Sequence, residues 1–289
     1  MKISTDWKDY EIIATGNGEK LERWKNIYLL RPDPQIIWKS SFDLASYEKL
    51  NGHYLRSSTG GGRWEIIKNI PEQWQISYKN LTFSIKTMGF KHTGLFPEQA
   101  VNWDIMIDLI KKENRPISVL NLFAYTGGAS VACASAGASV CHVDCVKQIV
   151  EKAKENARLS GLENANIRYI VDDCKKFVER EIRRGHKYDA IIMDPPSFGR
   201  SDSKTVWKLE DDLFDFVKLC NQVLSDNPLF VLINSYTTGL PQTVIENVLR
   251  LGLDNKEGYY CSYEVGLPTK EKINLPCGCS AMYSKYEIK

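Results

Sequence analysis

The stretch NLFAYTGGAS, residues 121–130, decides how this sequence is interpreted. It follows the apolar run ISVL and contains two adjacent glycines, Gly127 and Gly128. An apolar run that leads through a glycine turn into small residues is typical of a buried strand that turns tightly into a helix. Glycine lets the backbone of such a turn approach a ligand because it has no Cβ. Turns of this kind usually hold a nucleotide, so the stretch predicts a nucleotide site.

From about residue 101 onward, strand-like and helix-like segments alternate. The predicted strands cover residues 118–123, 138–144, 166–171, 188–194 and 228–234, with two paired strands at the end over 259–267 and 279–288. The predicted helices cover residues 127–137, 146–161, 175–184, 209–224 and 243–251. This alternation predicts an α/β fold: a Rossmann-like, seven-stranded, mostly parallel sheet with helices on both faces. Ligands bind such sheets at the carboxyl ends of the strands, where the strand order reverses.

The first part of the chain has a different texture. It is rich in tryptophan, tyrosine, isoleucine and turn residues, and short strands are predicted over residues 10–14, 26–31, 35–40, 64–69, 74–79 and 81–87. We therefore expect a β-rich N-terminal domain or cap over residues 1–85 and a second, catalytic domain over residues 86–289.

Composition limits the class of protein. The 289 residues are 43% hydrophobic and 26% charged, which is ordinary for a globular protein. There is no apolar run of the roughly 20 residues that a membrane helix needs, and the first ten residues lack a signal core, so we expect a cytoplasmic protein without membrane association. The eight cysteines form no CxxC pair, which favours reduced thiols and predicts no metal site. A net charge of +2 gives no strongly basic nucleic-acid footprint, although local patches stay possible.

Acidic residues follow the predicted strands. Asp144 ends the second strand, about 20 residues after the glycine turn, a spacing that suits the two hydroxyls of a ribose. Asp172 and Asp173 end the third strand. A single acid in such a position is also typical of a helix N-cap, and a single glycine pair is also typical of plain turn geometry. The coincidence of polar residues at successive strand ends favours a ligand site.

The glycine turn does not fit a pyrophosphate site. Neither GxGxxG nor GxxxxGK[ST] is present. The ligand should therefore carry a ribose and an adenine but little phosphate, and S-adenosylmethionine (SAM) fits this description. Its adenine amine would donate to Asp173, its ribose would bind Asp144, and its methionine end would lie over Gly127. Phe123 or Tyr125 would face the sulfonium cation.

The fourth strand ends in Asp194-Pro195-Pro196-Ser197-Phe198. Two prolines fix two φ angles and remove two amide donors, which leaves carbonyl oxygens and the Asp194 carboxylate as acceptors. Phe198 adds a flat face on which a base can stack. This combination predicts a site for a planar ring that bears an amine; the alternative is a loop that merely ends a strand.

Several of these segments together resemble a known family. LNLFAYTGGASV, HVD, ENARLSGL and VDDCKKFVEREIRRGHKYDAIIMDPPSFGR are similar to class I SAM-dependent methyltransferases, most of all to bacterial large-subunit ribosomal RNA methyltransferases of the cytosine-C5 type. GFKHTGLFPEQ, residues 89–99, resembles the segment that helps close the cofactor pocket in those enzymes. The resemblance covers about residues 85–289 and implies a SAM-dependent methyltransferase domain.

The resemblance also implies roles for single residues. Phe96, Pro97 and Gln99 would line the cofactor pocket, and Asp194 with Pro195 would lie beside the transferable methyl group. The full predicted cofactor site contains Phe96, Pro97, Gln99, Phe123, Tyr125, Thr126, Gly127, Asp144, Cys145, Asp173, Cys174 and Asp194. The predicted catalytic residues are Asp194, Pro195, Pro196 and Phe198.

The sequence departs from that subgroup in two ways. Residues 1–85 show no basic cluster of an RNA-binding domain, and the fifth strand is followed by Asn234-Ser235-Tyr236, where cytosine-C5 enzymes carry a cysteine. Cytosine C5 is a weak nucleophile that needs a thiolate added at C6. We therefore expect a nitrogen acceptor, with Cys277 and Cys279 as the loop thiols that a relocated nucleophile would use.

Several functions stay open from the sequence alone. The first is methylation of RNA, which the resemblance implies to be ribosomal RNA. The second is methylation of a small molecule or a protein side chain. A nucleotide-binding module without turnover is a third, and a Rossmann oxidoreductase is disfavoured by the missing GxGxxG. An RNA substrate needs a basic groove near the strand ends. Charges in helical and loop segments more often form a solvated face, but six residues could supply such a groove: Arg183, Arg184, Lys187, Arg200, Lys204 and Lys208. The oligomeric state is not predicted.

Overall fold

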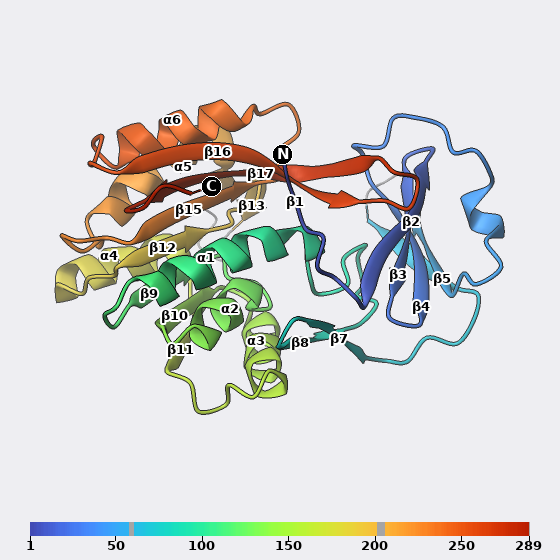
Figure 1. The fold of residues 1–289 in the computed structure, drawn as a ribbon, viewed down its shortest axis with the longest axis horizontal. Helices are drawn as coiled ribbons and strands as arrows, with labels where there is room; N and C mark the ends of the chain where they lie inside the picture. The colour runs from blue at the N-terminus through green and yellow to red at the C-terminus, as the bar shows by residue number, and fades with distance from the viewer. Residues whose placement is uncertain (58–60, 201–205, 289) are drawn as a thin grey trace. The chain divides into compact units, whose positions relative to one another are not determined.

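The computed structural model describes residues 1–57, 61–200 and 206–288 (Figure 1). The chain forms two compact units. The first contains Met1–Ala100 together with Val265–Cys277, and the second contains Val101–Glu264 together with Gly278–Lys289.

The second unit is built on a mostly parallel sheet. Among the described residues the strand order is β16-β17-β15-β12-β9-β10-β11, and β17 is antiparallel to β15. The bounds are β9 Ser118–Leu122, β10 Ser139–Asp144, β11 Ile167–Val171, β12 Ala190–Met193, β15 Phe230–Ser235, β16 Tyr259–Pro268 and β17 Asn274–Ser284. A further short strand, β1 (Lys2–Ile3), pairs with β16 at residues of the first unit. The predicted α/β fold with a mostly parallel sheet is confirmed, although β1 adds an eighth strand to the seven that were predicted.

The chain leaves the centre of this sheet in two directions. From β9 it proceeds outward through β10 to β11, and it then returns to β12 on the other side of β9. The strand order therefore reverses between β9 and β12, which is where ligands bind open α/β sheets. Their carboxyl ends are Leu122 and Met193, directly before the glycine turn and the Asp-Pro-Pro segment.

Helices cover both faces of this sheet (Figure 1). Their bounds are α1 Ala100–Lys112, α2 Gly128–Ser135, α3 Lys147–Leu159, α4 Cys174–Arg184, α5 Leu209–Asn221 and α6 Gln242–Gly252. Apolar residues of α4, α5 and α6 form one core with strand residues such as Leu120, Ile191 and Val231. Helices α2 and α3 pack against β9, β10 and β11. Helix α1 was not predicted, although Trp103, Met106 and Ile110 follow helical spacing.

The first unit is rich in β-strands, as predicted. Its described strands form a sheet in the order β2-β3-β4-β5-β6 and a separate hairpin, β7–β8. The bounds are β2 Tyr10–Gly16, β3 Glu19–Trp24, β4 Ile27–Pro32, β5 Gly52–Arg56, β6 Gly62–Ile66, β7 Trp74–Tyr78 and β8 Leu81–Ile85, with short 3₁₀ helices η1 Leu44–Ser46 and η2 Pro97–Gln99. The strand predicted over residues 35–40 is wrong, and β3 and β5 were not predicted.

A buried ion pair explains why the charged sequence EKLERW forms β3. The Glu22 side chain is fully buried and accepts two hydrogen bonds from the Arg31 guanidinium, at 2.5 and 2.8 Å, and one from the Tyr10 hydroxyl at 2.6 Å. Burial alone would raise the pKa of Glu22, but Arg31 and Lys20 outweigh it and hold that pKa below its usual value. Breaking such a pair leaves an uncompensated buried charge, so both partners are needed for this strand pairing.

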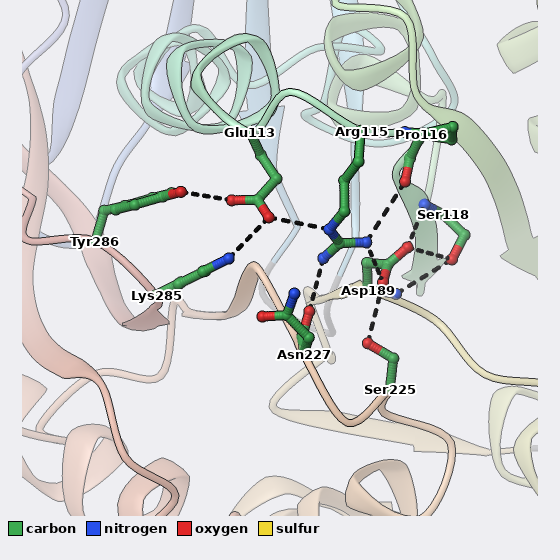
Figure 2. A network of polar contacts seen from close by, with 9 residues as sticks. All are labelled: Glu113, Arg115, Pro116, Ser118, Asp189, Ser225, Asn227, Lys285 and Tyr286. Carbon is green, nitrogen blue, oxygen red and sulfur yellow. Dashed lines mark hydrogen bonds and ion pairs between the residues drawn. The ribbon is translucent and has the colours of Figure 1, made fainter.

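A second polar network stabilises the amino-terminal edge of the large sheet (Figure 2). Arg115 lies between α1 and β9 and donates to Glu113 at 2.9 Å and to Asp189 at 2.8 Å. Lys285 and Tyr286, near the C-terminus, donate to the Glu113 carboxylate at 2.9 and 2.7 Å. The network joins the starts of β9 and β12 to the last strand, at the edge opposite to the predicted ligand site.

Candidate active site

The loop between β9 and α2 has a constrained backbone. Phe123 and Tyr125 both adopt left-handed conformations, with φ of 54° and 49°, and Gly127 follows with φ of 83°. Non-glycine residues in this region cost about 1–3 kcal/mol each and persist where surrounding contacts hold them, often at functional sites. The loop is thus held in a defined shape at the carboxyl end of β9.

The two glycines of this loop permit close helix packing. A Cβ on Gly127 would lie 2.8 Å from the Cβ of Ala153 on α3, and one on Gly128 would lie 2.8 Å from the ring of Trp103 on α1. Both distances are shorter than real Cβ contacts. From the sequence, the two glycines were predicted to let a ligand approach the backbone. The structure shows that the packing of α1, α2 and α3 also requires them.

The Asp144 carboxylate is fixed by two backbone amides. One oxygen accepts from Tyr125 at 2.9 Å and the other from Val146 at 3.0 Å. Asp144 is not the N-cap of α3, because Val146 holds that position. An ionised carboxylate has about four acceptor positions, so two stay available for donors such as a pair of hydroxyls.

The acid at the end of β11 has a structural role as well. Asp173 is the N-cap of α4, and its Oδ1 accepts from the amide of Lys176 at 3.0 Å. The sequence was also compatible with a helix N-cap at this position. One oxygen of Asp173 has that role. The neighbouring Asp172 pairs with Arg180.

The two cysteines predicted at the cofactor site differ in environment. Cys174 is buried, its Sγ accepts from the amide of Phe123 at 3.2 Å, and burial raises the pKa of its thiol. Cys145 is exposed, although its apolar surroundings in the sequence are typical of a buried thiol. Cys174 thus links the start of α4 to the loop after β9.

Buried polar residues support the glycine loop from beneath. Asn121 donates to the Ser130 hydroxyl, which lies 2.9 Å from Nδ1 of His142. Burial lowers the pKa of His142 to about 3, so the imidazole is neutral at physiological pH. On α3, Asn156 donates to the carbonyl of Thr126 at 2.8 Å. These contacts fix the path of residues 123–127 between the sheet and α3.

The Asp-Pro-Pro segment leaves the end of β12 and reaches the surface. Asp194 is half-buried and Pro195 is buried, whereas Phe198 is 55% exposed. The carbonyl of Pro196 accepts from the indole Nε1 of Trp207 at 2.7 Å. This carbonyl was expected to be an acceptor for a ligand, but it already has a partner within the protein.

Aromatic residues and hydroxyls surround this segment. The Phe123 ring lies 5.5 Å from Trp207 and 5.6 Å from Phe216, so it belongs to an aromatic cluster beside the predicted sulfonium position. The hydroxyls of Ser197 and Thr237 lie 2.7 Å apart, which links the segment to the loop after β15. Trp207 and Thr237 were not among the predicted site residues.

The other predicted site residues lie in the first unit. Phe96 precedes η2, and Pro97 and Gln99 are buried within it. The Pro97 carbonyl accepts from the indole of Trp7 at 2.9 Å. The role of these residues at the cofactor pocket stays a prediction.

The basic groove expected near the strand ends is not formed by the residues proposed for it. Arg183, Arg184 and Lys187 lie between the end of α4 and the start of β12, which is the opposite edge of the sheet. Arg184 pairs with Glu181, and Lys187 donates to the carbonyl of Gln222. Helix α4 begins at the carboxyl ends of the strands and ends at their amino ends. The prediction that these three residues line a groove at the carboxyl ends is therefore wrong. Lys204 and the side chain of Arg200 lie outside the described residues, and Lys208 is exposed beside the Asp-Pro-Pro segment.

The two thiols considered as a relocated nucleophile, Cys277 and Cys279, both have raised pKa values. Cys279 on β17 pairs with Ser235 at the end of β15, and burial followed by the charge of Glu264 raises the pKa of its thiol. Burial also raises the pKa of Cys277 well above its usual value. Because the thiolate is the reactive form, neither environment activates a cysteine.

Comparison with known proteins identifies the family. A model of the S-adenosylmethionine-dependent methyltransferases matches residues 46–252. The chain belongs to this family. A crystal structure of a SAM-dependent methyltransferase from Agrobacterium tumefaciens superposes with a TM-score of 0.92 at 33% identity, over 98% of this chain and 92% of that one. SAM is therefore the methyl donor, as predicted, and the alternatives of a binding module and an oxidoreductase are set aside.

Two curated relatives are named for ribosomal RNA. The ribosomal RNA large subunit methyltransferase K/L of Shewanella frigidimarina is 34% identical over 155 residues, which are 53% of this methyltransferase and 21% of the relative. A protein of Methanocaldococcus jannaschii, provisionally named a ribosomal RNA large subunit methyltransferase, is 36% identical over 215 residues, 69% of this chain and 55% of the relative. The chain thus spans between about a fifth and just over half of their lengths.

None of the helices in the described ranges is long and apolar enough to cross a membrane.

Proposed function

We propose that this methyltransferase transfers a methyl group to a nitrogen of a base in RNA, most directly large-subunit ribosomal RNA. The RNA substrate is supported by the names of the relatives. The nitrogen acceptor rests on the raised pKa values of Cys277 and Cys279 and on the sequence Asn234-Ser235-Tyr236, because a C5 acceptor would need a thiolate.

The cofactor site is proposed at the carboxyl ends of β9, β10 and β11. Asp144 would accept from the two ribose hydroxyls with the acceptor positions that Tyr125 and Val146 leave open. Asp173 would accept from the adenine amine through the oxygen that does not cap α4. The remaining proposed contacts come from Phe96, Pro97, Gln99, Phe123, Tyr125, Thr126, Gly127, Cys145 and Cys174.

The acceptor is proposed to lie beside the Asp194–Phe198 loop. Bound SAM supplies an electrophilic methyl group on a sulfonium. The acceptor lone pair would form the new nitrogen–carbon bond as the carbon–sulfur bond breaks, S-adenosylhomocysteine would leave, and an amine acceptor would then release a proton to solvent. Asp194 and the Pro195 carbonyl would hold the hydrogens of the amine so that its lone pair points at the methyl, which is a positioning effect. Phe198, with its exposed ring, would stack on the base.

The N-terminal domain, residues 1–85, is proposed to help recognise the acceptor together with the segment that follows it. Phe90 is 45% exposed, its ring lies 5.5 Å from His92, and His92 lies 5.2 Å from Phe96. Burial and the nearby charge of Arg31 lower the pKa of His92 to about 4, so this ring is neutral at physiological pH. A row of neutral rings suits stacking with unpaired bases. Phe90→Ala should weaken RNA binding about tenfold, because one base–aromatic stack is lost, while SAM affinity stays unchanged.

The test is transfer of tritiated methyl from SAM into separated fractions of a cell lysate. Label that becomes soluble after ribonuclease treatment and resists protease supports the proposal. Label that protease releases, or that stays with small molecules, would favour the alternative of a protein or small-molecule acceptor. Asp194→Ala protein is the matched control, because it should bind SAM but transfer little label.

A further inference from the structure

The Asp194–Phe198 loop leads into a hairpin formed by β13 (Phe198–Arg200) and β14 (Val206–Lys208). In this hairpin Phe198 pairs with Lys208 and Gly199 pairs with Trp207. A Cβ on Gly199 would lie 3.5 Å from Pro196 and 3.9 Å from Trp207. Trp207 is therefore placed opposite Gly199, close to the second proline of the loop.

The two prolines leave this loop with few amide donors of its own. The amide of Asp194 reaches the Leu122 carbonyl only at 3.4 Å. The loop is instead held through its carbonyls: Pro196 accepts from the indole of Trp207 at 2.7 Å, and Ser197 accepts from the amide of Leu209 at 3.1 Å. The indole contact is the shorter of these two carbonyl contacts and comes from a side chain, and the Ser197 hydroxyl adds a further side-chain contact to Thr237 at 2.7 Å.

The same side chain reaches the loop after β9. The Trp207 ring lies 5.5 Å from Phe123 and 5.6 Å from Phe216, and the Phe123 amide is bound by Cys174. Phe123 is also one of the residues with a left-handed backbone. Trp207 thus contacts the loop at the proposed methyl donor and the loop at the proposed acceptor, while its own position is fixed by the hairpin and by α5.

We infer that Trp207 is a positioning residue for methyl transfer. Its N–H fixes the Pro196 carbonyl, and its ring fixes the spacing between that loop and Phe123, so that acceptor and methyl are aligned. This inference rests on the proposed role of the Asp194 loop in holding the acceptor. A residue that only filled space would affect stability through its ring, whereas Trp207 acts on turnover through its N–H.

Trp207→Phe keeps an aromatic ring and removes the donor. At saturating SAM, with an unmodified large-subunit ribosomal RNA transcript as acceptor, we expect kcat to fall by about 10- to 100-fold and SAM affinity to stay within about twofold. Trp207→His offers a ring donor again and should recover part of the loss. Phe216→Leu is the matched control: it removes a ring contact of Trp207 but keeps the N–H, so it should lower the melting temperature at least as much with a smaller effect on kcat.

A second readout needs no acceptor. Hydrogen–deuterium exchange of the peptide over residues 194–199 should become faster in Trp207→Phe than in Phe216→Leu, while a peptide from α3 exchanges at the same rate in both. Equal exchange and equal kcat in the two variants would overturn the inference. If the wild-type protein fails to methylate RNA at all, the proposed function falls, and the exchange measurement still decides whether Trp207 fixes the loop.

Discussion

The backbone amide of Tyr125 donates to the Asp144 carboxylate at 2.9 Å, although the two residues lie nineteen positions apart in the chain. This bond joins the loop after β9 to the end of β10. It holds Tyr125 in its left-handed conformation and aims the carboxylate at the same time. This contact, together with the one from the Val146 amide, therefore links the shape of the glycine loop to the orientation of the Asp144 carboxylate, which is the proposed ribose acceptor.

Asp144→Ala should lower SAM affinity by at least about tenfold. The change removes two charge-assisted hydrogen bonds to the ribose, each worth about 1.5–3 kcal/mol, and it frees the Tyr125 amide. Calorimetry measures the dissociation constant. Asp173→Ala can be compared with it in stability. Loss of the α4 N-cap should lower the unfolding free energy of Asp173→Ala by about 1 kcal/mol. An unchanged SAM affinity in Asp144→Ala would rule out its assignment to the ribose.

Asp194→Ala should affect turnover more than cofactor binding. We expect the turnover number to fall by about 100-fold or more because the acceptor loses its orientation, while SAM affinity stays within several-fold. Steady-state kinetics and calorimetry on the same preparation separate the two effects. A collapse of affinity with normal turnover per bound cofactor would mean that Asp194 belongs to the cofactor site instead.

Glu113 should make stability sensitive to acid. Burial alone would raise its pKa, but hydrogen bonds from Lys285, Tyr286 and Arg115 lower it to about 2 from the usual 4.5. A lowered folded-state pKa stabilises the protein above about pH 4.5, and this contribution is lost as the pH falls toward 2. The unfolding free energy of Glu113→Gln should therefore lie below that of the wild type at neutral pH, with the gap closing in acid.

Urea denaturation at several pH values measures this gap. The exposed Glu163 supplies the control, since Glu163→Gln should track the wild type throughout. A gap for Glu113→Gln that stays constant from neutral pH to pH 2 would contradict the role given to the network in Figure 2.

The sequence predicts the large sheet well and the smaller one less well, for physical reasons. Buried parallel strands such as β12 and β15 are continuous apolar runs, so their pattern is unambiguous. In β3, Glu22 is inward-facing, and only its pairing with Arg31 nine residues later makes that position compatible with a core. Residues 35–40 contain two isoleucines and a tryptophan but form no strand. Pairing between strands, rather than local propensity, decides these segments.

The candidate site shows the same division. The position of Asp144 is predictable because it depends on the strand that it ends. Trp207 was not predictable, since its contacts with Pro196 and Phe123 exist only once β14 folds back beside the Asp-Pro-Pro loop. Arg183 and Arg184 were wrongly predicted to line a groove at the strand ends. They lie at the end of α4, which is at the opposite edge of the sheet.

The nature of the acceptor atom tests the central claim most directly. Wild-type protein and the variants Cys277→Ser, Cys279→Ser and the double variant are incubated with deuterated SAM and an unmodified large-subunit ribosomal RNA transcript. Mass spectrometry of the digested nucleosides then locates the methyl group. We predict a methylated ring or exocyclic nitrogen in all four reactions, with similar yields, because neither thiol is activated. Methyl at a pyrimidine C5 in the wild type, together with loss of product in either cysteine variant, would contradict the account in favour of a thiolate mechanism.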